Sequence, residues 1–163
     1  MSVPGTAQRG GPSGETFGVT LDQATTIVDV ALAHGVAMGF APLTVAVLDP
    51  GGHVVVLKRS DGSGIFRAEV ATAKAWSVLA MGWPARELTE RANRMPQFFA
   101  ALGVLAGGRM LPVAGGVPLR SSAGGLLGAV GISGDTSDND EACALRGIEV
   151  AGLVPWLERT SGP

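Results

Sequence analysis

The sequence predicts an α+β fold in which a central antiparallel sheet of about five strands is flanked by helices. Two hairpin turns, at residues 49–52 and 121–125, and the lack of alternating strand and helix units favour this class over a parallel nucleotide-binding fold. The chain has 163 residues, of which 46% are hydrophobic and 16% charged, so it can bury one sizeable core. We expect a flexible leader rich in Gly, Pro and Ser over residues 1–18 and a single domain over residues 19–160.

The first half of this domain begins with an amphipathic helix and a hairpin. Thr20 and Gln23 have the spacing of a capping box, and apolar residues then recur at helical spacing over residues 21–36. A run of β-branched and other apolar residues predicts a buried strand at 43–48, and after the turn the chain returns as a second strand at 53–58.

A long helical pattern covers residues 66–81. Its register predicts that Phe66 and Trp76 are buried. The other faces of this helix then carry Arg67, Glu69 and Lys74. Two shorter helices begin near Pro84 and Pro96, because proline is well suited to the first helical turn.

The second half is predicted to add the remaining strands and one helix. Short apolar runs between glycine pairs and turns predict strands at 110–113 and 126–132. Ser137 can cap a final helix whose first turn is acidic, which suits the helix dipole. We expect that helix to run to about Leu153, before Pro155 ends it.

Composition excludes several classes of partner. The formal net charge is −2 and no Lys/Arg cluster is present, which argues against nucleic acid. No apolar run reaches the length of a membrane span, and no signal-peptide pattern appears, so we expect a cytoplasmic protein that does not enter the membrane. Low charge with a positive mean hydropathy predicts a homo-oligomer. The single cysteine, Cys143, cannot form an internal disulfide and is interpreted as a small core or interface residue.

The usual motifs of metal and nucleophile chemistry are absent from the sequence. The two histidines, His34 and His53, lie in unrelated segments, so no metal site is predicted. We interpret His34 as a residue at a helix end and His53 as the start of a strand, although either imidazole could also serve as an axial ligand of haem iron. Neither a nucleophile elbow nor a phosphate-binding loop nor a dinucleotide fingerprint occurs.

Two glycine-containing loops are the best candidates for a binding site. One is Arg59-Ser60-Asp61-Gly62, followed by the helix that carries Glu69 and Lys74; the other is Gly115-Gly116-Val117-Pro118, which offers bare backbone N–H groups. A cation and free amides together could bind an anionic group. Alternatively, Lys74 is a solvated or salt-bridged helix residue and Asp61 only forms a turn.

Several motifs together resemble the GlcG/HbpS family of haem-binding and haem-degrading-type proteins, which includes the C-terminal domain of PduO. In the order of the chain they are Val45-Ala46-Val47-Leu48-Asp49-Pro50-Gly51-Gly52-His53, Arg59-Ser60-Asp61-Gly62, Ala71-Thr72-Ala73-Lys74-Ala75, Gly115-Gly116-Val117-Pro118-Leu119, Gly128-Ala129-Val130-Gly131-Ile132-Ser133-Gly134 and Asp140-Glu141. The resemblance spans residues 20–153. It implies a profilin-like layered sandwich, even-numbered oligomers such as octamers, a pocket near the loops that contain Gly115 and Gly134, and binding of haem or a corrinoid-related ligand.

The first functional hypothesis is a binding module for haem or another flat, carboxylate-bearing small molecule. The residues assigned to ligand binding are Arg59, Arg109, Arg120, His53 and Gly134, together with the Gly115-Gly116-Val117-Pro118 loop. Arginine pairs well with propionate groups, and Lys74 is a further cation for the same purpose. A purely structural or partner-binding subunit is a third reading.

The second hypothesis is an enzyme without a cofactor, such as a dehydratase, isomerase or cyclase that acts on a small oxygenated metabolite. Asp61 or Glu69 would then be the general base, and Lys74 would stabilise a developing enolate. The amides of Gly115 and Gly116 would hold the oxygen of that enolate.

Overall fold

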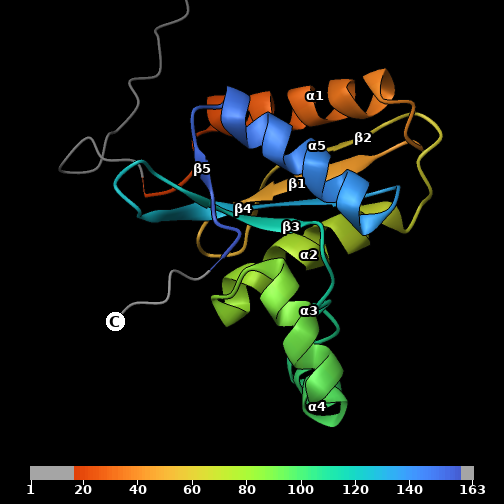
Figure 1. Ribbon diagram of the computed structural model, residues 1–163, viewed down its shortest axis with the longest axis vertical. Helices are drawn as coiled ribbons and strands as arrows, with labels where there is room; N and C mark the ends of the chain where they lie inside the picture. Colours follow the sequence, from red (N-terminus) through yellow and green to blue (C-terminus); the bar gives the residue numbers. More distant parts are fainter. Residues whose placement is uncertain (1–16, 159–163) are drawn as a thin grey trace, which may run out of the picture.

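The computed structural model describes residues 17–158 and shows a layered α+β domain around one open sheet (Figure 1). In chain order the elements are α1 (Leu21–Ala37), β1 (Thr44–Leu48), β2 (Val54–Arg59), α2 (Arg67–Met81), α3 (Ala85–Arg94), α4 (Pro96–Leu105), β3 (Gly116–Arg120), β4 (Leu126–Ser133), α5 (Ser137–Val150) and β5 (Val154–Pro155). The strand order is β2-β1-β4-β3-β5, and every neighbouring pair is antiparallel. The predicted fold class is thus confirmed. The leader expected over residues 1–18 lies almost wholly outside the described residues.

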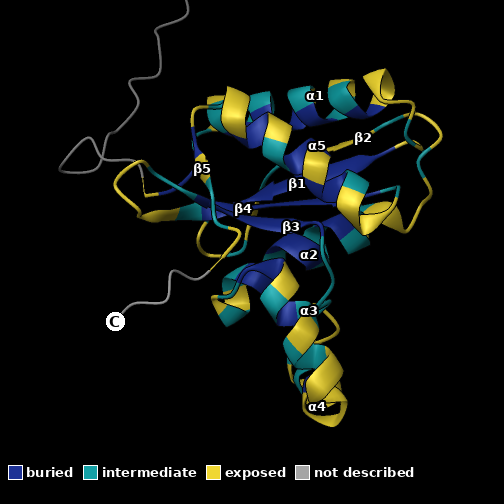
Figure 2. Ribbon diagram, viewed as in Figure 1, coloured by how far each residue is buried: buried dark blue, intermediate teal, exposed yellow. Residues whose placement is uncertain are grey.

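Helices cover both faces of the sheet. Helices α1 and α5 pack side by side on one face, and α2 packs on the other, with α3 and α4 beyond it (Figure 1). Each face has its own hydrophobic cluster, and the middle of the sheet is buried between them (Figure 2). Within the described residues, no helix is long and apolar enough to span a membrane.

Small residues allow α2 to approach the sheet closely. A Cβ on Gly131 of β4 would lie 2.0 Å from the carbonyl oxygen of Ala71, and one on Gly116 of β3 would lie 2.4 Å from that of Lys74. Real Cβ atoms do not approach so near, so glycine is needed where the helix crosses these strands. The buried stripe of α2 therefore consists mainly of small side chains, including Ala71 and Ala75.

Local signals near the start of the chain are confirmed. Thr20 and Gln23 form the predicted capping box, with the amide of Gln23 donating to Oγ1 of Thr20 and the amide of Thr20 donating to Oε1 of Gln23. Residues 49–52 make the first hairpin turn, between β1 and β2, and residues 121–125 make the second, between β3 and β4.

The prediction of a strand at residues 110–113 is wrong. This segment has no strand pairing; it crosses α2, where the amide of Leu111 donates to Oγ of Ser77. The strand is instead β3, which includes Gly116, Val117 and Pro118. These residues were expected in an open loop, but they are buried in the sheet. At Gly116 the missing side chain lets α2 pack directly on the backbone, whereas Val117 packs in the cluster on the opposite face.

Two expectations about the helices also need correction. Phe66 is 70% exposed, because the face of α2 toward the sheet has room only for small side chains. Lys74 is buried on that face, because its long, thin side chain extends past its small neighbours. The last helix is capped by Thr136 rather than Ser137 and ends at Val150, three residues earlier than expected. The chain then turns through Gly152, at φ +71°, into the short strand β5.

Candidate functional site

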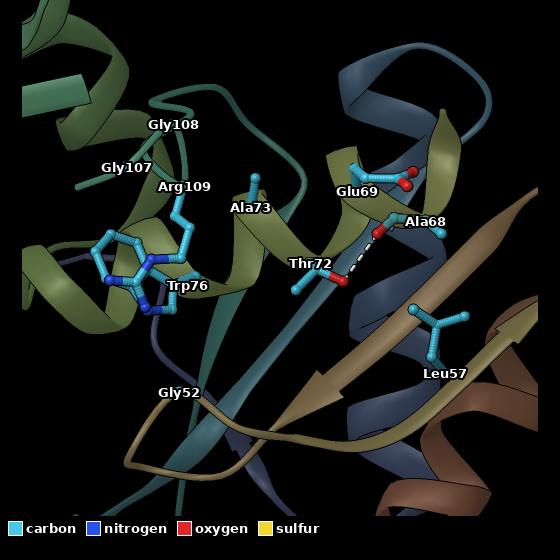
Figure 3. Close-up of a pocket in the computed structure, with 10 residues that line it drawn as sticks. All are labelled: Gly52, Leu57, Ala68, Glu69, Thr72, Ala73, Trp76, Gly107, Gly108 and Arg109. Carbon is cyan, nitrogen blue, oxygen red and sulfur yellow. Dashed lines mark hydrogen bonds between the residues drawn. The ribbon is translucent and has the colours of Figure 1, made fainter. Parts of the chain in front are cut away.

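A cleft of about 430 Å³ opens on the outer side of α2 (Figure 3). Its ten lining residues are Gly52, Leu57, Ala68, Glu69, Thr72, Ala73, Trp76, Gly107, Gly108 and Arg109. They come from the β1–β2 turn, from β2, from α2 and from the connection between α4 and β3. The volume is within the usual range of small-molecule sites, and most of the wall is apolar.

Helix α2 supplies half of the cleft wall through one face. Glu69, Thr72, Ala73 and Trp76 are spaced i, i+3, i+4 and i+7, which places them on the same side of a helix. This face points away from the stripe that packs on the sheet. Thr72 is held in place because its Oγ1 donates to the carbonyl oxygen of Ala68 over 2.8 Å.

The β1–β2 turn positions the indole of Trp76. Gly52 has φ +81°, and a Cβ there would lie 2.9 Å from Cδ1 of Trp76. A side chain at position 52 would therefore strain the turn and push the indole. Trp76 is only partly buried, so one side of its ring is available to the cleft.

Arg109 covers one end of the cleft. Its guanidinium carbon lies 4.4 Å from the centroid of the Trp76 ring, within the distance of a cation–π contact. Its Nε donates to the carbonyl oxygen of Ala106 at the end of α4. Arg109 forms no ion pair with a carboxylate in the described residues, so the guanidinium is able to meet an anionic group of a ligand.

Glu69 lies at the other end of the cleft (Figure 3). Trp76 is seven positions further along α2, which corresponds to about 10 Å along a helix axis. The cleft therefore has a cation over an aromatic ring at one end, a carboxylate at the other and small apolar residues between them. Such an arrangement suits a flat ligand whose acidic edge faces Arg109.

Lys74 does not join the cleft. Its Nζ lies 2.9 Å from Oδ2 of Asp140, and both side chains are buried. Gly115 lies against this ion pair, since a Cβ there would be 2.8 Å from Nζ of Lys74. Lys74 is thus a salt-bridged helix residue, which is the alternative that the sequence left open beside anion binding.

Asp61 and Gly134 lie near the start of β1, away from the cleft. Asp61 lines a separate cavity of about 120 Å³, together with Pro42 and Leu43. Gly134 packs against the same segment, where a Cβ would be 2.5 Å from the carbonyl oxygen of Pro42. The three candidate catalytic residues, Asp61, Glu69 and Lys74, therefore occupy three different environments and do not converge.

The other predicted ligand-binding residues are also dispersed. Arg59 is exposed at the end of β2, and Arg120 stacks on Trp156 with 3.9 Å between the guanidinium carbon and the ring centroid. His53 is exposed beside Asp49, and His34 lines a shallow groove between α1 and α5. Of the residues assigned to the site from sequence, only Glu69 and Arg109 line the cleft. Within residues 17–158, no cluster of three or more His, Cys, Asp or Glu side chains could hold a metal ion.

Comparison with known proteins identifies the family. The family described as haem degrading protein HbpS-like matches residues 19–149, which is most of the chain. The chain belongs to the HbpS-like family. A relative in Citrobacter freundii, an uncharacterized 15.0 kDa protein from the dhaT-dhaS intergenic region, is 24% identical over 77% of this chain and 87% of its own length.

Solved structures share the HbpS-like fold. HbpS has a TM-score of 0.71 and 29% identity, with 89% of this chain and 98% of that chain covered. The crystal structure of a PduOC–haem complex has a TM-score of 0.75 and 23% identity, with 84% of this chain and 97% of that chain covered. The second likeness is one of fold alone.

Sequence reasoning missed the aromatic part of the cleft. The sequence predicts Trp76 in the core, and it assigns none of Leu57, Thr72, Gly107 and Gly108 to a binding site. One signal was present: the i, i+3, i+4, i+7 stripe through Glu69 and Trp76 is the face opposite to the small-residue stripe. The contribution of residues 107–109 could not be read from sequence, because it depends on how the connection after α4 folds back over α2.

Proposed function

We propose that this protein binds a flat, carboxylate-bearing ligand of the tetrapyrrole class, haem included, in the cleft that Trp76 and Arg109 line at one end. The carrying observation is the stack of the Arg109 guanidinium on the Trp76 indole at the end of an apolar cleft. A flat ring would pack along the small residues of α2, and a propionate would pair with the guanidinium. Membership of the HbpS-like family and the haem complex of PduOC support the same class of ligand.

The lining residues fit the ring and its carboxylates better than they fit the iron. Haem iron is held in proteins by His, Cys, Met or Tyr, and none of the ten lining residues is of these types. Haem, when bound, would bring the redox and oxygen chemistry of its iron. The residues of the cleft would bind and orient the macrocycle, with Arg109 fixing the acidic edge and Trp76 the ring plane.

The first test is a titration with haemin followed at the Soret band. The wild type should give a saturable shift, and both Arg109→Leu and Trp76→Leu should weaken binding by about tenfold or more, the size expected for losing one charge-assisted or aromatic contact. Arg94→Leu removes an exposed arginine of α3 far from the cleft and serves as the control. A wild-type spectrum identical to that of free haemin would refute the proposal.

The second test asks whether the iron matters. Because no side chain typical of haem ligation lines the cleft, iron-free protoporphyrin should bind within about threefold of haemin, as measured by tryptophan quenching. His34→Ala and His53→Ala should leave haemin binding unchanged. Loss of binding in either histidine variant would place the ligand elsewhere and assign that imidazole to the iron.

We also propose that the protein self-associates into an even-numbered homo-oligomer. The positive mean hydropathy of the chain and the many large apolar side chains that are exposed in the single subunit support this assembly.

A further inference from the structure

Glu69 and Arg109 are the only charged residues among the ten that line the cleft, and they lie at opposite ends of it (Figure 3). The other lining residues carry no charge, and the hydroxyl hydrogen of Thr72 is already donated to the carbonyl oxygen of Ala68. The cleft is therefore polarised along α2, with a cation over Trp76 at one end and an anion at the other.

The carboxylate of Glu69 has no partner in the described part of the chain. Within residues 17–158 it forms no salt bridge, and the residue is exposed. Glu69 lies in the first turn of α2, where the helix dipole favours a negative charge. The negative end of the cleft is thus a property of the protein itself and does not depend on a ligand.

This polarity restricts how a flat acid can lie in the cleft. Positions 69 and 76 are about 10 Å apart along α2, which is comparable with the width of a tetrapyrrole macrocycle. When a carboxylate of the ligand pairs with Arg109, the opposite edge of the same ligand comes against Glu69. A second carboxylate on that opposite edge would meet a like charge, which opposes binding.

We propose that Glu69 is a specificity-determining residue, which excludes ligands that are acidic on both edges. The cleft then selects flat ligands with one acidic edge and a neutral or cationic opposite edge. Selectivity arises here from an unfavourable contact with the wrong ligand as well as from the favourable contact with Arg109. The tetrapyrrole form of this inference rests on the proposed function, whereas the polarity of the cleft applies to any flat aromatic acid.

The simplest alternative is that Glu69 only stabilises the first turn of α2. That role would affect the stability of the protein, but it would be the same whichever ligand is bound. The ratio of the affinities for two ligands separates the two roles, because an effect on the helix cancels from the ratio while repulsion of one ligand does not.

Two iron-free porphyrins measure the selection. Protoporphyrin IX carries its propionates on one edge, and coproporphyrin III has further propionates on the opposite edge in place of vinyl groups. In low salt, Glu69→Gln should shift the ratio of the two dissociation constants by about fivefold in favour of coproporphyrin, the factor expected for one like-charge contact open to water. Glu69→Lys should shift it further. Tryptophan quenching gives both constants.

A matched control removes a carboxylate elsewhere. Glu149→Gln takes an exposed negative charge from α5, on the other face of the sheet, and should keep the wild-type ratio. The shift in Glu69→Gln should shrink in about 1 M NaCl, because salt screens exposed charges. A ratio that is equal in the wild type and Glu69→Gln, or a shift that salt does not change, would overturn the proposal. Circular dichroism must show that the variants are folded.

A flat acid of another class separates this inference from the proposed function. If protoporphyrin does not bind the wild type, the proposed function fails, and 2-naphthalenesulfonate and 2,6-naphthalenedisulfonate test the polarity of the cleft instead. Glu69→Gln should then favour the disulfonate over the monosulfonate by about fivefold relative to the wild type, with quenching that Trp76→Leu reduces. An unchanged preference, or no quenching by either sulfonate, would refute the role of Glu69.

Discussion

Lys74 and Asp140 form a buried ion pair that joins the two helical layers around the end of the sheet. The side chains are 6% and 1% exposed, and α2 and α5, which carry them, lie on opposite faces. Oδ1 of Asp140 also accepts a hydrogen bond from the amide of Asp135, just after β4. Burial raises the pKa of the Asp140 carboxyl, while the Lys74 ammonium and the Asp135 amide oppose that rise.

Removing one partner of the Lys74–Asp140 ion pair should destabilise the folded protein. Lys74→Met leaves the Asp140 carboxylate buried without its counter-ion and should lower the free energy of unfolding by about 3–5 kcal/mol. Lys74→Met combined with Asp140→Leu should recover part of that loss. Urea denaturation measures both values. Lys58→Met, which removes an exposed pair with Asp29, should cost no more than about 1 kcal/mol, and an equally small effect at Lys74 would contradict the structural role.

Gly131→Ala should destabilise the protein through the contact of α2 with β4. The new Cβ would lie 2.0 Å from the carbonyl oxygen of Ala71, so the helix must move away from the sheet. We expect a loss of about 3 kcal/mol or more by thermal or urea unfolding. Gly103→Ala is the matched control, because nothing lies within 4 Å of a Cβ there and α4 should gain up to about 1 kcal/mol. Similar stabilities for the two variants would mean that α2 is not so close to β4.

Asp135 should contribute a stabilisation that disappears in acid. Hydrogen bonds from the amides of Ala41 and Thr136 lower the pKa of its carboxyl in the folded protein. The stabilisation is complete above the unfolded pKa of about 3.9 and is lost as the pH falls through the lower folded value. The wild type should therefore exceed Asp135→Asn in stability by a constant margin from pH 7 to 5, and the margin should shrink below about pH 4.

Urea unfolding at several pH values measures this margin. Asp29→Asn, which removes an exposed ion pair with Lys58, is the control; its free energy of unfolding should differ little from that of the wild type across the same pH range. A margin between the wild type and Asp135→Asn that grows in acid would have the wrong sign for this mechanism.

Cys143 should resist thiol reagents as long as the protein is folded. Burial, with the nearby carboxylates of Asp140 and Asp135, raises the pKa of its thiol to about 11. At pH 8 little thiolate exists, and the side chain is fully buried in α5. Modification by an aromatic disulfide should be at least about a thousandfold slower than in urea and should follow global unfolding. Rapid labelling of the native protein would show that α5 opens locally.

Local signals predicted the parts of the fold that depend on neighbouring residues. The Asp49-Pro50-Gly51-Gly52 turn and the Thr20 cap act over a few residues, so their geometry follows from the sequence there. The strand β3 was missed because it includes Pro118 and begins with Gly116, both of which normally weaken a strand. Pro118 is accommodated because its carbonyl oxygen faces the short edge strand β5 and accepts from the amide of Trp156, so its missing N–H lies on that same side and no bond between β3 and β4 requires it.

The environment of α2 explains the errors at the candidate site. Large aromatic residues usually indicate the buried face of a helix, but here the facing strands present Gly116 and Gly131 and admit only small side chains. Trp76 is therefore displaced outward to the cleft, and Lys74 is drawn inward to Asp140. Neither outcome can be deduced from α2 alone, because each depends on strands more than 35 residues further along the chain. The cytoplasmic location and the roles of the predicted site residues stay predictions.

The position of β4 between β1 and β3 has a consequence for how the chain reaches its native state. Strand β1 (residues 44–48) pairs on one side with β4 (residues 126–133), so this pairing forms only after that later segment is available. Likewise, α1 packs against α5, which consists of residues 137–150. Contacts between such distant segments make folding slow, since the closure of a long loop precedes the stabilising contacts. During synthesis on the ribosome, the apolar face of α1 and the first hairpin therefore remain uncovered until nearly the whole domain has emerged, which makes the nascent chain a natural client for chaperones.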